Sequence, residues 1–142
     1  MTRDEVVLAA MAAGGAGATY SPVQVQKLFF LIDTEAAHLV GGKHFNFQPY
    51  DYGPFDRGVY DTLEALAKSN LAVVSDTGRF KTYSLTGEGI AAGERALATL
   101  SPQARSYVEE LTRWLRGLSF EQLVSAIYKR YPEMRVNSVF RG

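Results

Sequence analysis

Apolar residues recur every three or four positions over several stretches of the chain, which is the pattern of helices with one buried face. The first such stretch covers residues 3–13, where Val6 and Met11 lie on the apolar face, and two consecutive glycines follow it. The pattern therefore predicts a short helix over residues 3–13 and a glycine-rich loop over residues 14–20.

A second helix start lies at Ser21–Gln24. Serine is a preferred N-cap, proline fits the first helical position, and Gln24 has the spacing of a capping box. The apolar stripe that follows predicts a helix from Ser21 to about Leu39, before two glycines. Lys27 falls within this stripe. It could contact a phosphate or an acidic group of a partner, but such a lysine more often lies on the solvent face or extends its ammonium group to water.

Aromatic residues crowd the next segment, residues 43–54, which has no helical period and ends at a Gly-Pro pair. We expect an extended chain here. The apolar spacing then predicts a helix over residues 55–69, with Val59 and Leu63 on its buried face and Asn70 as its C-cap.

Two strand-like runs, residues 71–75 and 79–85, flank the turn sequence Asp76-Thr77-Gly78 and predict a hairpin. Three further helices are predicted after it by their apolar periods and by their N-caps, which are Thr86, Ser101 before a proline, and Ser119 in a capping box with Gln122. Their expected ranges are 87–99, 102–116 and 119–131, and residues 133–142 are expected to form a tail.

This order of elements predicts a mainly α fold with a small β-hairpin, in a single domain over residues 1–142. Three helices followed by a hairpin are typical of a winged helix-turn-helix-like core, which would cover residues 1–99. The helix over 55–69 would then be the recognition helix, and Asp76–Lys81 the tip of the wing. Residues 100–142 would form a C-terminal helical extension.

The composition excludes several classes of protein and of functional site. The chain has 142 residues, balances 15 basic residues with 15 acidic ones, and contains no cysteine. The length fits one domain, and the lack of cysteine excludes disulfides, thiolate metal sites and cysteine nucleophiles. No apolar run is long enough to span a bilayer, and the N-terminus does not resemble an export signal. The expected location is the cytoplasm.

Motifs for catalysis and cofactor binding are missing from the sequence. The glycines at 14–17 match neither a dinucleotide-binding fingerprint nor a P-loop, and no serine lies in a GxSxG motif. A cluster of His38, His44, Asp33 and Glu35 is conceivable, but metal sites need further ligands at matched spacing. We therefore expect no enzymatic activity, no cofactor and no metal site.

Several local strings together resemble a known group of proteins. They are Val25-Gln26-Lys27-Leu28-Phe29-Phe30, Tyr50-Asp51-Tyr52-Gly53-Pro54-Phe55, Tyr83-Ser84-Leu85-Thr86, Tyr131-Pro132 and Asn137-Ser138. Through them, residues 4–140 resemble the winged-helix-like group that contains the Panacea (SocA-like) antitoxin domain and the YwgA-like uncharacterised bacterial proteins. The resemblance implies a protein that acts by direct contact with a protein partner, such as a toxin, and it implies no catalytic residues.

The aromatic string departs from the Panacea pattern. Panacea domains usually have Trp-x-Tyr/His-Gly-Pro, where this chain has Tyr50-Asp51-Tyr52-Gly53-Pro54. The resemblance is therefore nearer to the YwgA-like proteins, for which no antitoxin role is implied.

The segment from Tyr50 to Arg57 contains the candidate partner-binding residues. In the functional interpretation, Tyr50, Tyr52 and Phe55 form a docking surface, with Asp56 and Arg57 at the start of the following helix. In the structural interpretation, the same aromatic side chains fill the space between two helices. One aromatic residue could do both, with a buried ring and an exposed hydroxyl group.

Binding to nucleic acid is the alternative function. The expected recognition helix over 55–69 carries two basic and three acidic residues, a net charge of −1, which suits a phosphate backbone poorly. Residues 105–142 carry seven basic residues against four acidic ones, a net charge of +3. The candidate nucleic-acid-binding residues are Arg79, Lys81, Arg113, Arg116, Lys129 and Arg130.

A homodimer is a further possibility that the sequence leaves open. The last two helices carry Val108, Leu115 and Ile127 among other apolar residues, which exceed what a small winged core must bury. These side chains could pack within the chain or against a second copy.

Overall fold

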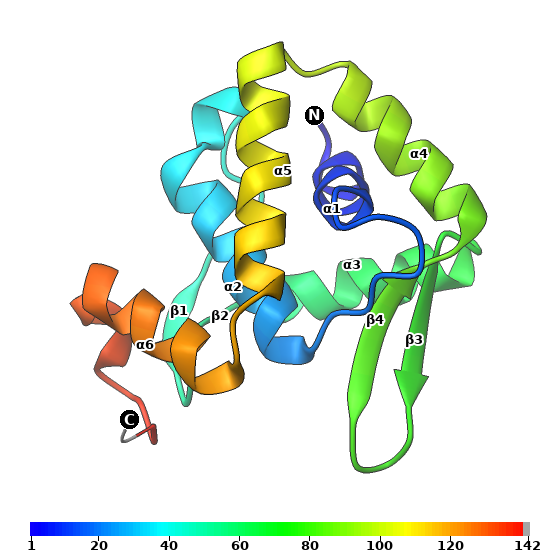
Figure 1. Ribbon diagram of the computed structural model, residues 1–142. Helices are drawn as coiled ribbons and strands as arrows, with labels where there is room; N and C mark the ends of the chain where they lie inside the picture. The colour runs from blue at the N-terminus through cyan, green and yellow to red at the C-terminus, as the bar shows by residue number, and fades with distance from the viewer. Residues whose placement is uncertain (141–142) are drawn as a thin grey trace.

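The chain folds into six α-helices and two antiparallel hairpins within residues 1–140, the part that the computed structural model describes (Figure 1). The helices are α1 (Arg3–Ala12), α2 (Pro22–Glu35), α3 (Arg57–Lys68), α4 (Gly87–Ala98), α5 (Pro102–Arg116) and α6 (Phe120–Arg130). The strands are β1 (Gln48–Tyr50), β2 (Gly53–Phe55), β3 (Ala72–Asp76) and β4 (Lys81–Leu85), and two 3₁₀ turns are η1 (Ala37–Leu39) and η2 (Pro132–Arg135). The prediction of a mainly α fold with a small β-hairpin is confirmed.

Two helices, α1 and α2, lie at the centre of the fold. Every side chain from Val6 to Ala12 is buried, because α3, α4, α5 and β4 all pack around α1, which Figure 1 views almost end-on. The small alanines of α1 let α4 approach closely. A Cβ atom on Gly93 of α4 would lie 2.3 Å from the carbonyl oxygen of Leu8, so this position needs glycine.

Helix α2 is buried from Val25 to Asp33 and packs against α3, α5, α6, β2 and β4. It begins as predicted, with Ser21 and Gln24 in a reciprocal capping box. It ends earlier than predicted, at Glu35, because Ala36 leaves the helical conformation and the chain continues in η1. The predicted end at Leu39 is therefore wrong.

The extended aromatic segment contains a hairpin that the sequence did not predict. Gln48 pairs with Phe55 and Tyr50 with Gly53, which leaves a two-residue turn at Asp51 and Tyr52. Because Phe55 belongs to β2 and Asp56 is the N-cap, α3 begins at Arg57 rather than at 55. The second hairpin, β3–β4, lies where the sequence predicted it.

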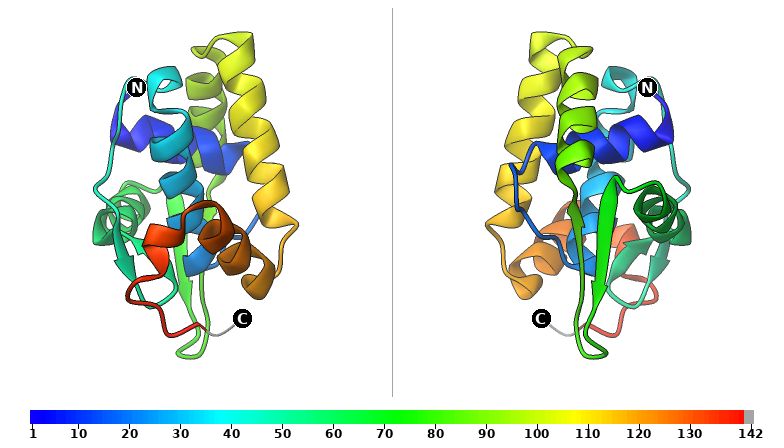
Figure 2. Two further views of the ribbon diagram at one scale, coloured as in Figure 1. Left: turned by 90° about the vertical axis from the view of Figure 1, so that its left-hand side faces the viewer. Right: turned by 90° about the vertical axis from the view of Figure 1, so that its right-hand side faces the viewer.

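Of the tail expected over residues 133–142, the structure describes residues 133–140, and residues 141 and 142 lie outside the described part. The described residues form most of η2 and a segment packed on the β1–β2 hairpin. They turn back along the β1–β2 hairpin, as Figure 2 shows for the chain after α6. The amide nitrogen of Val139 donates to the Asp51 carbonyl at 2.9 Å, and the Asn137 side chain donates to the Pro49 carbonyl at 3.2 Å. The ring of Phe140 is buried at the end of this segment. The described C-terminal chain thus supports the hairpin turn.

Helices α5 and α6 contribute to the same hydrophobic core as α1 and α2. Val108, Leu115, Leu123 and Ile127 are all buried within the chain. They are four of the six residues whose apolar character suggested a homodimer, and the other two, Leu111 and Leu118, are partly buried against the same core. The homodimer stays a prediction.

Candidate functional site

A pocket of about 390 Å³ opens where the β1–β2 turn meets the N-terminal half of α2. Its walls come from three helices and from the β1–β2 hairpin. The lining residues are Pro22, Val23, Gln26 and Lys27 of α2, Tyr50 to Gly53 and Phe55 of the hairpin, Tyr60 of α3 and Phe120 of α6. A pocket of this size with mostly apolar walls and a few polar groups is typical of a binding site.

Three of the five predicted partner-binding residues line this pocket. Tyr50 and Phe55 stack with their ring centroids 5.1 Å apart, and Tyr52 meets Phe120 edge to face at 5.2 Å. The exposed fractions are 54% for Tyr50, 42% for Tyr52 and 44% for Phe120, so these rings border the opening rather than fill the core. Tyr50 and Tyr52 therefore lie at the surface, and their role in binding a partner stays a prediction.

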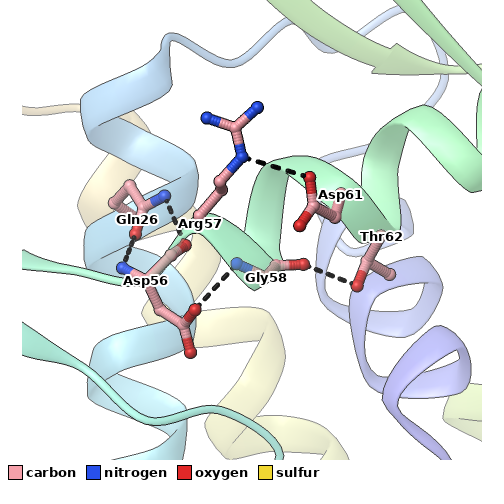
Figure 3. A network of polar contacts seen from close by, with 6 residues as sticks. All are labelled: Gln26, Asp56, Arg57, Gly58, Asp61 and Thr62. Carbon is pink, nitrogen blue, oxygen red and sulfur yellow. Dashed lines mark hydrogen bonds and ion pairs between the residues drawn. The ribbon is translucent and has the colours of Figure 1, made fainter.

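The other two predicted residues lie outside the pocket, at the start of α3. Figure 3 shows the Asp56 carboxylate capping α3, where its Oδ1 accepts from the Gly58 amide at 2.7 Å. Its Oδ2 accepts from the Asn46 amide at 2.6 Å. Arg57 is exposed and forms a 3.6 Å ion pair with Asp61, one turn later. Asp56 therefore holds the local backbone, and Arg57 belongs to the outer face of α3.

Gln26 joins α2 to the beginning of α3. Its side-chain nitrogen donates to the Asp56 carbonyl at 2.9 Å, and its side-chain oxygen accepts from the Asp56 amide at 2.9 Å (Figure 3). A buried glutamine that satisfies both backbone groups of one residue acts as a clamp, since leaving those groups unpaired is costly. Gln26 thereby sets the angle between α2 and the pocket wall.

Lys27 lies at the base of the pocket, and its side chain is buried rather than solvent-facing as the sequence suggested. The residue is 3% exposed, and its ammonium nitrogen Nζ donates to the Pro54 carbonyl at a long 3.3 Å. Burial lowers the pKa of Lys27 to about 7, because an apolar environment disfavours the charged amine. The expectation of a solvent-facing Lys27 was wrong because α2 is enclosed on every side and has no solvent face at this position.

Gly53 keeps the space beside Lys27 open. It adopts a φ of +102°, and a Cβ atom at this position would lie 3.6 Å from the Lys27 nitrogen and 3.2 Å from the ring of Tyr128. Glycine is the residue that both accepts this backbone conformation and leaves room at the pocket floor.

The candidate nucleic-acid-binding residues are dispersed. Arg79 and Lys81 lie on the β3–β4 hairpin, whereas Lys129 and Arg130 end α6, and these two elements are well separated in Figure 1. Arg113 and Arg116 are in the last turn of α5, where Arg116 lies over the ring of Tyr20 at 5.4 Å. Arg130 forms an ion pair with Glu35 at 3.1 Å. The structure does not bring these six residues together into one patch.

A second polar cluster surrounds Glu35, at the end of α2. Tyr107 donates its hydroxyl group to one carboxylate oxygen at 3.0 Å, while Tyr131 donates to the other, which also faces Arg130. Burial and the neighbouring carboxylate raise the pKa of Tyr131 to about 12. Because each oxygen of Glu35 has a partner from α5 or α6, this cluster joins three helices.

Two of the residues considered for a metal site, His44 and Asp33, make other contacts, and the ring Nε2 of His44 lies 3.0 Å from the Val40 carbonyl oxygen. The Asp33 carboxylate accepts from the backbone amides of His44 and Phe45, at 2.9 and 2.8 Å. Within residues 1–140, no group of three histidine, aspartate or glutamate side chains is arranged to hold a metal ion.

No protein-family model matches the chain, and no curated protein has a matching sequence.

Over the described residues, none of the helices has the length and apolar character needed to cross a membrane.

The sequence indicated the aromatic rim of the pocket but gave no indication that Gln26, Tyr60 and Phe120 line it, and it did not predict that Lys27 is buried. A signal for Lys27 was present. Apolar residues surround it on all sides of the helical wheel from Val25 to Ile32, and a helix that is apolar all round is a buried helix.

Proposed function

We propose that this protein is a non-enzymatic, winged-helix-like interaction module, antitoxin-like or regulatory, that binds a protein partner at the aromatic pocket. The observation that carries the proposal is the group of exposed rings at the pocket opening, Tyr50, Tyr52 and Phe120. Aromatic residues that frame a partly apolar pocket are typical anchors of protein interfaces, because they bury a large area at little entropic cost.

The order of the elements supports the winged-helix part of the proposal. Between α1 and α2, Tyr20 pairs with Tyr83 of β4 through two backbone hydrogen bonds of 2.8 and 2.9 Å. This isolated bridge joins the α1–α2 connection to the β3–β4 hairpin, which would be the wing of the proposed fold. The resemblance of the sequence to Panacea and YwgA-like proteins agrees with this order and favours a protein partner.

The exposed face of α3 favours a protein partner over DNA. Its exposed charged residues are Arg57, Asp61, Glu64 and Lys68, two basic and two acidic. A recognition helix contacts phosphates and bases in the major groove, where two carboxylates would be repelled. In addition, residues 36–56 separate α2 from α3, whereas a helix-turn-helix joins its helices by three or four residues.

DNA binding is the second candidate, and the β3–β4 tip is the observation that favours it. Arg79 and Phe80 are exposed there, with the guanidinium group of Arg79 5.7 Å from the centroid of the Phe80 ring. A basic residue beside an aromatic ring on a wing tip could contact a DNA backbone and groove. This function predicts binding to duplex DNA that weakens steeply as salt increases.

Site-specific cross-linking in cells tests the proposed function. A photoreactive phenylalanine analogue replaces Tyr52 in one protein and Phe80 in a matched control, because both residues are exposed aromatics at hairpin tips. We expect position 52 to form an adduct with a defined protein and position 80 to form none with that protein. The partner is then identified by mass spectrometry and purified.

Binding of the purified partner decides the outcome. A Tyr50→Ala, Tyr52→Ala double substitution should weaken the affinity at least about tenfold, since each is an exposed anchor, and Phe80→Ala should leave it unchanged. Equal binding by all three proteins would refute the proposed site. If position 80 cross-links only to DNA and Arg79→Ala abolishes duplex binding, the second candidate is correct instead.

A further inference from the structure

Lys27 places a positive charge at the base of an otherwise aromatic pocket without an acidic counterpart. Among the ion pairs of residues 1–140, none involves Lys27. Asp51 lines the pocket from the hairpin turn but is exposed to solvent, and the Asp56 carboxylate is occupied by two backbone amides. The remaining titratable groups that face the pocket are tyrosines, which are neutral at physiological pH.

The hydrogen-bonding capacity of Lys27 is also unfilled. An ammonium group has three N–H donors, and the Pro54 carbonyl accepts one of them at 3.3 Å, near the upper limit of a hydrogen bond. Gly53 leaves space at this point, since a Cβ atom there would contact the end of the lysine side chain. Lys27 therefore lines the pocket although its residue is only 3% exposed, and its remaining N–H donors are available to an occupant of the pocket.

We propose that the segment of the partner that occupies this pocket presents a carboxylate to the ammonium group of Lys27, next to an apolar or aromatic side chain. This inference rests on the proposed function. One carboxylate neutralises one buried cation. The hydrogen bond between two charged groups is also stronger than a hydrogen bond between neutral groups. The rings of Tyr50, Phe55 and Tyr60 form the apolar wall against which the neighbouring side chain packs. A phosphate would bring a second negative charge for which the pocket holds no second cation.

Binding of such a group depends on pH through Lys27. Burial lowers the pKa of Lys27 to about 7 in the free protein, so above that pH most molecules carry a neutral lysine. Those molecules must take up a proton when they bind a carboxylate. The affinity for a carboxylate should therefore be highest below pH 7 and fall as the pH rises, whereas the affinity for an uncharged ligand of the same shape should stay constant.

Two small probes test the inference, 3-phenylpropanoate and 3-phenylpropanamide, which share an aromatic ring and chain and differ in charge. Binding is followed by chemical-shift changes in the amide spectrum of the full ¹⁵N-labelled chain. At pH 6 the acid should bind about tenfold more tightly than the amide, with shifts at the residues that line the pocket. By pH 9 this preference should fall at least about tenfold, and calorimetry in two buffers should show proton uptake.

Lys27→Met should abolish the preference for the acid while the amide still binds, because methionine keeps the length of the side chain without its charge. Lys68→Met, at an exposed lysine on α3, is the matched control and should keep the preference. The wild-type pH dependence and proton uptake test the inference even if Lys27→Met fails to fold.

Equal binding of acid and amide at pH 6 would overturn the inference and leave the apolar docking of a partner intact. A preference for the acid that survives Lys27→Met would overturn it as well. Failure of both probes to shift the pocket resonances at millimolar concentration would also count against it, whereas the proposed function is judged separately by cross-linking at position 52.

Discussion

Replacing Lys27 by methionine should change how the stability of the protein depends on pH. In the folded chain, burial lowers the pKa of Lys27 to about 7 from its ordinary value of 10.5. Between these values the unfolded chain binds more protons than the folded chain, so the free energy of unfolding rises as the pH rises. The charged lysine therefore destabilises the fold fully below about pH 7, and this effect disappears as the pH approaches 10.5.

The magnitude follows from the two pKa values. Integrated from pH 6 to pH 9, the titration of Lys27 adds about 2.5 kcal/mol to the free energy of unfolding of the wild-type chain. The Lys27→Met variant lacks this contribution and should be the more stable protein at pH 6. The interval ends at pH 9 because several tyrosines, Tyr20 and Tyr83 among them, have raised pKa values and act in the opposite direction above pH 10.

Urea denaturation followed by circular dichroism measures the effect, at constant ionic strength and at intervals from pH 6 to pH 9. Subtracting the free energy of unfolding of the wild type from that of Lys27→Met removes the contributions of the other titrating groups. This difference should shrink by about 2.5 kcal/mol over this range. Lys68→Met, at an exposed lysine, should run parallel to the wild type. Parallel curves for wild type and Lys27→Met would refute the reasoning, because they would mean that Lys27 titrates alike in the folded and unfolded chains.

Two further substitutions test the packing around the site. Gly93→Ala should lower the free energy of unfolding by roughly 2–3 kcal/mol in thermal or urea denaturation, because its Cβ atom would collide with the α1 backbone. The control is Gly87→Ala, whose Cβ atom meets no atom within 4 Å and which should be neutral or slightly stabilising. Equal effects of the two substitutions would contradict the packing argument. Gln26→Leu should cost roughly 1–3 kcal/mol, because it leaves the Asp56 amide at the start of α3 without its partner, while the Asp56 carbonyl still accepts from the Val59 amide. Gln103→Leu, at an exposed position, should change the free energy of unfolding by less than about 0.5 kcal/mol.

Helix positions were predictable because their signals are local. Ser21 and Ser119 each form the reciprocal capping box that their sequences indicated, and Thr86 caps α4 as predicted. A cap depends on residues three positions apart, so the sequence contains the whole interaction. The β3–β4 hairpin was predictable for the same reason, since a turn sequence joins two strand-like runs.

The β1–β2 hairpin was not predictable because its supports are distant in the sequence. Its register places Pro49 opposite Pro54, and proline is unusual within a strand. The contacts that support it come from Asn137 and Ser138, 88 and 87 positions away from their partners in the hairpin. The local pattern therefore predicted an extended segment, and only the folded chain supplies what pairs it into a hairpin.

Three buried polar side chains of α2 bond to the chain between residues 44 and 56, which connects α2 to α3, and their hydrogen bonds distinguish Lys27 from the other two. Gln26 pairs both polar atoms of its side chain with one backbone residue, and Asp33 pairs both carboxylate oxygens with two backbone amides. Lys27 makes one long hydrogen bond and lowers the stability of the fold below pH 7. An apolar side chain would hold α2 against β2 without that cost. The structural role that explains Gln26 and Asp33 therefore does not explain Lys27, whereas the proposed carboxylate of a partner would.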